Sequence, residues 1–162
     1  MTLFKDDKNS VYGALRNIQL ANLFLPKWKT YIYIPTNIPN TRALVIEDKM
    51  KQKMIELGAT IVYIDLKTMM IPVRLVNTLI ADNTHITHFL VRDVMHRLSD
   101  CDAKVARDFI PSDKCIHYLR YQEGNGKNRI KLLPGKWEGN RNKLTIYLKG
   151  KTMQQYIQVL YP

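Results

Sequence analysis

The order of local patterns along the chain restricts its fold most, because helical and extended stretches alternate. From Ser10 to Leu25, apolar residues recur every three or four positions, which predicts an amphipathic helix that Pro26 ends. Residues 30–34 then read Thr-Tyr-Ile-Tyr-Ile, a run of β-branched and aromatic side chains typical of a strand. A chain that repeats this order builds βα units around a mostly parallel sheet.

The alternation continues through the next hundred residues. A second helix is expected over residues 43–57, because Gly58 stands where a glycine commonly ends a helix. Ser99 and Asp102 have the spacing of a capping box and predict the start of another helix there. The remaining expected elements are strands at 60–65, 86–91 and 114–119 and helices at 71–79 and 99–109. We expect the four strands to be neighbours in one mainly parallel sheet.

The chain has the length of a single domain, and no repeat, linker or low-complexity tract divides it. We therefore expect one domain over residues 1–162. Residues 121–143 are rich in Gly, Asn and Lys, which predicts a loop with at most short strands. Residues 144–148 are expected to be extended, and residues 152–160 to form a short helix.

Composition excludes some classes of protein and leaves others open. No apolar run reaches the roughly 18–20 residues of a membrane helix, and the first residues lack the apolar core of a signal peptide. We therefore expect a cytoplasmic protein without a transmembrane segment. The 25 Lys and Arg against 14 Asp and Glu give a formal net charge of +11, which favours polyanionic partners. Because these charges are spread along the chain without a nucleic-acid-binding motif, nucleic acid binding is kept as an alternative function.

The two cysteines have neither zinc-site spacing nor the pattern of a disulfide framework. Cys101 and Cys115 are therefore interpreted as reduced core residues. In the helix expected over 99–109, the spacing predicts an inner face of Cys101, Val105 and Phe109.

Polar residues follow directly after two of the expected strands. Asp65 ends one of them, and Arg92, Asp93, His96 and Arg97 follow another. Ligands of open α/β sheets bind outside the carboxyl ends of the strands, so these residues are candidates for a binding site. The alternative from local pattern alone is an aspartate that accepts hydrogen bonds from loop amides, beside exposed arginines.

Residues 87–99, which read Thr-His-Phe-Leu-Val-Arg-Asp-Val-Met-His-Arg-Leu-Ser, resemble a segment of an uncharacterised glycosyltransferase-like family. Members of that family carry an Arg-Asp-x-Asp-Ser-Arg-Leu motif there. Further short stretches resemble the family in the same order: residues 12–17, 26–28, Arg74, residues 117–120, 135–139 and 154–157. The resemblance therefore covers nearly the whole chain, through motifs that are each short.

The resemblance implies a GT-A-type fold, a Rossmann-like three-layer sandwich that binds a nucleotide diphosphate sugar of the UDP or GDP type. It also implies transfer of a hexose to an acceptor that the sequence does not identify. The substrate-binding residues it implies are Asn17, Arg74, Arg92, Asp93, His96, Arg97, His117, Arg120 and Trp137. We expect the group around Asp93 to lie beside Gly13 and Asn17, with Arg74 approaching the same cleft. Trp28 and Trp137 could each stack on a sugar or a base, and Trp28 is interpreted as a core residue.

The sequence departs from the family where its acids would hold manganese or magnesium. Asp93 is kept as a possible metal ligand, but the second acid of the motif is Met95, a soft thioether unsuited to these cations. Tyr121 and Gln154 stand where the family has two further acids. The cofactor is therefore either none or manganese or magnesium, with arginines able to bind the phosphates in place of a metal. Whether the chain is an active transferase or an inactive binding or interaction module stays open.

Overall fold

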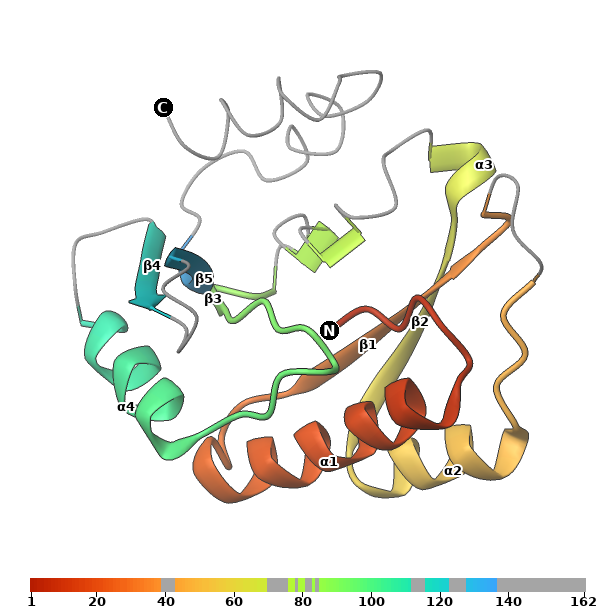
Figure 1. Cartoon of the computed structure of the whole chain (residues 1–162), viewed down its shortest axis with the longest axis horizontal. Helices are drawn as coiled ribbons and strands as arrows, with labels where there is room; N and C mark the ends of the chain where they lie inside the picture. The colour runs from red at the N-terminus through yellow and green to blue at the C-terminus, as the bar shows by residue number, and fades with distance from the viewer. Residues whose placement is uncertain are drawn as a thin grey trace.

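The computed structural model describes residues 1–38, 43–69, 76–77, 79–80, 83 and 85–111, and describes residues 116–122 and 128–136 as backbone. Its helices are α1 (Lys8–Phe24), α2 (Asp48–Glu56), α3 (Leu66–Met69) and α4 (Asp100–Phe109). Its strands are β1 (Thr30–Thr36), β2 (Ala59–Asp65), β3 (His88–Phe89), β4 (Ile116–Gln122) and β5 (Asn128–Lys136). The chain is therefore a mixed α/β protein, as its alternating pattern predicts (Figure 1).

A parallel pair of strands confirms the expected βα unit. β1 and β2 pair in regular register, from Thr30 opposite Ala59 to Thr36 opposite Asp65. α2 connects them, and Gly58 follows it with φ of 88°, a left-handed conformation that favours glycine. Figure 1 shows α1 and α2 side by side along the same side of these two strands.

The first residues of the chain continue this parallel arrangement on the other side of β1. The backbone N–H of Leu3 donates to the carbonyl oxygen of Tyr33 at 2.9 Å, and that of Tyr33 donates to the carbonyl oxygen of Met1 at 2.8 Å. Thr2 forms parallel bridges both to Tyr33 and to Asp93. Four extended segments thus follow one another in the order β2, β1, the segment around Thr2, and the segment that ends at Asp93.

The prediction that all four expected strands share one parallel sheet is wrong. β3 and β4 lie in a separate antiparallel sheet, on either side of β5. The physical reason lies beside β1, where the segment around Thr2 takes the backbone hydrogen bonds that a further strand would need. The residues expected as a strand at 86–91 accordingly form only the two-residue β3.

β5 also corrects the prediction of a loop over residues 121–143. That stretch is rich in Gly, Asn and Lys, which is typical of a loop, but it contains a nine-residue strand. The strand forms because both of its edges are hydrogen-bonded, to β3 on one side and to β4 on the other. Tertiary pairing outweighs local propensity here, as is common for strands.

The main core lies between α1 and the parallel strands. Val11, Ala14, Leu15 and Ile18 recur at helical spacing and pack in one cluster with buried apolar residues of β1, including Ile32. α1 begins at Lys8 and not at the expected Ser10, because the carboxylate of Asp7 accepts the backbone N–H of Ser10 at 2.9 Å. That hydrogen bond lowers the pKa of Asp7.

α2 is shorter than the helix expected over 43–57, since residues 43–47 precede its first turn. Met54 is its one buried residue, and Met50 and Leu57 pack against the same core. Among the described helices, none has both the length and the apolar composition needed to cross a membrane.

α4 confirms the predicted capping box and corrects the predicted inner face in part, because Phe109 is buried as predicted but Cys101 is not. Ser99 accepts the backbone N–H of Asp102, and the carboxylate of Asp102 accepts the backbone N–H of Ser99. Cys101 is exposed, so its interpretation as a core thiol is wrong. The helix is turned so that Asp102 can reach the buried side chain of Arg92, at 3.3 Å, and this places Ala103 and Ala106 in the core.

Several predictions lie outside the described residues. These are Cys115, most of the helix expected at 71–79, the extended stretch at 144–148 and the helix at 152–160.

Candidate functional site

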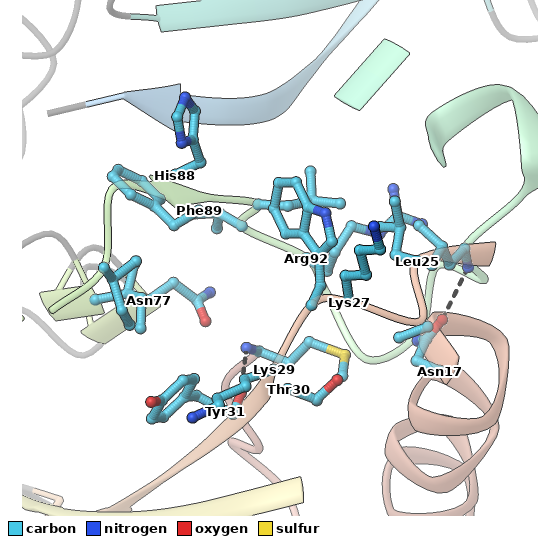
Figure 2. Close-up of a pocket in the computed structure, with 18 of the residues that line it drawn as sticks. Asn17, Leu25, Lys27, Lys29, Thr30, Tyr31, Asn77, His88, Phe89 and Arg92 are labelled. Atoms are coloured by element: carbon cyan, nitrogen blue, oxygen red, sulfur yellow. Dashed lines mark hydrogen bonds between the residues drawn. The ribbon is translucent and has the colours of Figure 1, made fainter. Parts of the chain in front are cut away.

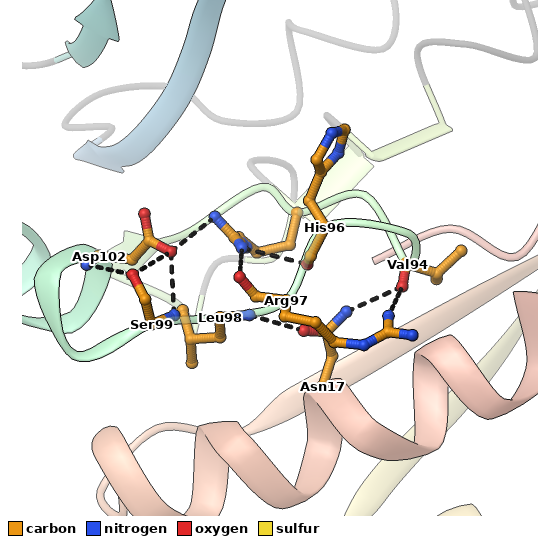
Figure 3. Close-up of polar contacts among 8 residues, drawn as sticks. Asn17, Val94, His96, Arg97, Leu98, Ser99 and Asp102 are labelled. Atoms are coloured by element: carbon orange, nitrogen blue, oxygen red, sulfur yellow. Dashed lines mark hydrogen bonds and ion pairs between the residues drawn. The ribbon is translucent and has the colours of Figure 1, made fainter. Parts of the chain in front are cut away.

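The segment of residues 92–99, which carries the family resemblance, lies against α1 as expected. Asn17 is 2% exposed and uses both ends of its side-chain amide to hold this segment. Its Nδ2 donates to the carbonyl oxygen of Val94 at 3.0 Å, and its Oδ1 accepts the N–H of Leu98 at 2.8 Å (Figure 3). A Cβ on Gly13 would lie 2.6 Å from that same carbonyl oxygen, so only glycine permits this approach.

Arg92 is buried between residues 92–99 and α4, and its side chain connects the two through an ion pair. Its guanidinium Nη1 lies 3.3 Å from the carboxylate of Asp102, and both side chains are almost fully buried. Its Nη2 donates to the carbonyl oxygens of His96 and Arg97, at 3.1 and 2.8 Å. The charge of Arg92 is therefore paired within the fold, and its donors orient the turn.

Asp93 and His96 point their side chains toward solvent, with exposed fractions of 58% and 53%. The Oδ1 of Asp93 accepts the N–H of Met95 at 2.8 Å, and its Oδ2 lies 3.7 Å from Nδ1 of His96. Arg97 donates from Nη1 to the carbonyl oxygen of Val94 at 2.8 Å. The contacts of Asp93 correspond to the loop-amide alternative, while a role in substrate binding stays a prediction for these residues.

The other strand-end aspartate, Asp65, is likewise bonded within its own loop. Its carboxylate accepts the side-chain N–H of Asn37 at 2.9 Å, the hydroxyl of Thr68 at 2.8 Å and the backbone N–H of Lys67 at 3.0 Å. These hydrogen bonds, that of Asn37 first, lower the pKa of Asp65. Within the residues described, no three His, Cys, Asp or Glu side chains come together as a metal site would require.

The four other predicted residues are Arg74, His117, Arg120 and Trp137. Arg74 and Trp137 lie outside the described residues, and His117 and Arg120 lie on β4, which is described as backbone.

A pocket of about 520 Å³ lies between the first half of β1 and the segment of residues 85–92 (Figure 2). This volume is within the range of small-molecule sites, about 300–1,000 Å³. Of the residues predicted from sequence, Asn17 and Arg92 line the pocket. Asp93, His96 and Arg97 are not among its lining residues, so the pocket lies beside the predicted group and does not contain it.

The chemistry of the lining combines aromatic rings with positive charge. Trp28, Tyr31, Tyr33 and Phe89 supply the rings, and Lys27 and Lys29, both exposed, supply the charge. The described lining includes no Asp or Glu. An anion with a flat apolar part would therefore meet attraction here and no repelling carboxylate from these residues.

Met1 also lines the pocket, but its amine adds no charge at neutral pH. It donates to the carbonyl oxygen of Tyr31 at 2.8 Å, and burial lowers its pKa to about 5. Since Arg92 is paired with Asp102, the two lysines are the main fixed positive charges of the described lining.

Sequence reasoning did not name Lys27 and Lys29, which line the pocket just before β1, as site residues. Trp28, interpreted as core, does pack against the cluster that contains Leu25 and Leu98, but it also lines the pocket. The available signal was the run Lys27-Trp28-Lys29, in which an aromatic residue stands between two cations at the start of a strand.

Comparison of the chain with protein-family models, curated proteins and solved structures found no match.

Proposed function

We propose that this chain binds a nucleotide diphosphate sugar in the pocket beside β1, and that binding does not require a divalent cation. The observation that carries the proposal is the lining of the pocket, in which aromatic rings and two lysines occur without a carboxylate among the described residues. The sequence resemblance to a glycosyltransferase-like family adds independent support for this class of ligand.

The two kinds of lining residue suit the two parts of such a ligand. A base or a sugar ring stacks on aromatic side chains, a contact worth about 1–3 kcal/mol per base. A diphosphate is held by charge-assisted hydrogen bonds, which contribute about 1.5–3 kcal/mol each when they are well formed. Lys27 and Lys29 flank Trp28 in the chain, so phosphate and ring contacts can be made from one short segment.

The proposal of metal-independent binding follows from the available ligands. Magnesium in nucleotide sites is usually held by one or two carboxylates together with phosphate oxygens. Asp93 has its Oδ1 bonded to the N–H of Met95, and Met95 supplies no hard oxygen ligand. Lysines can neutralise the diphosphate in place of the metal.

Transfer of the hexose is a separate step that the family resemblance implies, and it would be measured as release of the nucleoside diphosphate.

Isothermal titration with UDP, GDP and their sugars, in EDTA and in manganese, tests the proposal. We expect binding in EDTA, an affinity changed less than threefold by manganese, and weaker binding as salt screens the exposed lysines. Binding that disappears in EDTA would contradict metal independence. Failure of all these ligands to bind, with binding of a single-stranded RNA oligonucleotide instead, would favour the nucleic acid alternative.

The variants Lys27→Gln and Lys29→Gln locate the site. Each should weaken nucleotide binding about tenfold, since each removes one charge-assisted contact. Lys49→Gln is the matched control, because Lys49 is an exposed lysine of α2 that does not line the pocket. Equal weakening in all three variants would indicate that net charge alone, and not this pocket, attracts the ligand.

A further inference from the structure

Asn77 brings a fixed polar group into the pocket. It lines the cavity, and Figure 2 shows it well apart from Lys27, so the two residues border different parts of the space. The hydroxyl of Thr2 donates to the Oδ1 of Asn77. This bond fixes which end of the amide is the oxygen, and Nδ2, a donor of two hydrogen bonds, is the group that Asn77 can donate to a ligand.

The residue that orients Asn77 is itself held firmly. Thr2 is 2% exposed, and its backbone is bridged in parallel both to Tyr33 and to Asp93. The hydroxyl of Thr2 therefore has a fixed position. A donor fixed in this way discriminates among ligands better than a freely rotating amide, because little ordering is needed when the ligand binds.

The surroundings of Asn77 suit the base of a nucleotide better than its phosphates. Its neighbour Val76 is fully buried, in one cluster with Tyr33 and Ile80, and Tyr31 and Phe89 pack against that cluster. This part of the pocket is apolar and aromatic, whereas the lysines that suit phosphates precede β1. A few well-placed polar groups in an apolar lining are what give such pockets their specificity.

We propose that Asn77, oriented by Thr2, is a specificity-determining residue that donates a hydrogen bond to a carbonyl oxygen of the nucleobase. This inference rests on the proposed function. Uracil and guanine carry such an oxygen, whereas adenine presents an amino group, itself a donor, at the corresponding edge. A donor facing a donor leaves both without a partner, and a site built for a hydrogen bond rejects a ligand that cannot make it. The site therefore selects nucleotides whose base carries a carbonyl group.

Titrations of UDP, GDP, ADP and inorganic pyrophosphate against the wild type, Asn77→Ala and Thr2→Val test this inference. We expect the wild type to bind UDP and GDP at least about tenfold more tightly than ADP, the ratio that one such hydrogen bond sustains. Asn77→Ala should bring the UDP to ADP ratio close to one, and Thr2→Val should reduce it, because the amide is then free to turn. Pyrophosphate affinity should stay the same in all three proteins, which separates contacts to the base from contacts to the phosphates.

The results that would contradict the role of Asn77 differ from those that would contradict the proposed function. Equal binding of UDP and ADP by the wild type would overturn the role of Asn77 and leave the proposed nucleotide site standing. A wild-type preference for ADP would show that the amide presents Oδ1 to the ligand, and would overturn it also. Failure of all four ligands to bind would overturn the proposed function itself. A ratio retained in Asn77→Ala, at unchanged melting temperature, would assign the selectivity to another residue.

Discussion

Two neighbouring regions of the molecule hold polar side chains that look equally suited to binding a ligand, but they use them differently. In residues 92–99 the buried polar groups are engaged with the protein itself: Arg92 is paired with Asp102, and the backbone is bonded to Asn17. In the pocket, Lys27 and Lys29 are exposed and stand beside aromatic rings. The pocket presents its two lysines to an incoming anion, whereas Arg92 is buried beside its counter-ion.

The difference shows that a polar residue at a strand end can either stabilise the fold or bind a ligand. A sequence motif does not distinguish these two roles. Burial of an ion requires a partner, because an unpaired buried charge is strongly unfavourable. Arg92 satisfies this requirement within the fold, so changes there should act on stability. Changes at the pocket lysines should act on ligand affinity and leave stability nearly unaltered.

The largest expected effect on stability is that of Arg92→Met. Removal of one partner from a buried ion pair leaves the carboxylate of Asp102 buried without its counter-ion, which costs about 3–5 kcal/mol. Urea denaturation measures the change. The matched control is Arg107→Met, because Arg107 pairs with Asp100 at 3.6 Å on the surface, where such a pair contributes below about 1 kcal/mol. Equal losses in the two variants would show that the buried pair has no special weight.

Asn17→Ala should have the second largest effect and lower the free energy of unfolding by about 2–4 kcal/mol. The carbonyl oxygen of Val94 and the N–H of Leu98 both lose a buried partner in this variant. Asn22→Ala provides the control on the same helix. Asn22 makes a single exposed bond, from Nδ2 to the carbonyl oxygen of Leu57 at 2.8 Å, so its loss should be nearer 0.5–1 kcal/mol, roughly that of one ordinary hydrogen bond. A smaller loss at Asn17 than at Asn22 would contradict the structural role of residues 92–99.

Gly13→Ala should lower the free energy of unfolding by about 1–2 kcal/mol. This is the typical loss from overpacking, reduced by the gain in helix propensity when alanine replaces glycine. The sign is informative, because alanine in place of glycine within a helix otherwise stabilises. The new Cβ would lie 2.6 Å from the carbonyl oxygen of Val94, a backbone atom that cannot turn aside. The melting temperature reports the change. An increase would mean that residues 92–99 can move away from α1 at little cost.

The smallest effect on stability is expected from Lys29→Gln, with a change within about 0.5 kcal/mol, as for most exposed positions. The same variant is expected to weaken nucleotide binding, so the two measurements on one protein sharpen the contrast between the regions. A marked loss of stability in Lys29→Gln would place this lysine with Arg92, among residues required for the fold.

Local features of the fold were predictable where neighbouring residues decide them. The capping box of Ser99 and Asp102, the glycine after α2 and the parallel strands β1 and β2 all follow from short-range patterns. β5 was not predictable in this way, because its pairing with β3 and β4 stabilises a stretch whose own composition is that of a loop. The exposure of Cys101 was missed because the pairing of Asp102 with Arg92, a residue outside the helix, accompanies a rotation of α4 that the helical spacing does not reveal.

The features of the candidate site also separate into those that the sequence determined and those that only the tertiary structure determined. The sequence by itself determined that the chain is an α/β protein and that its formal net charge is +11, and it led us to expect residues 92–97 against α1. Only the tertiary structure decided that Arg92 and Asn17 hold the fold together, while Lys27, Trp28 and Asn77 surround a cavity. The physical reason is that a side chain's partners are set by its neighbours in space, and residues such as Thr2 and Asn77 are 75 positions apart in the chain.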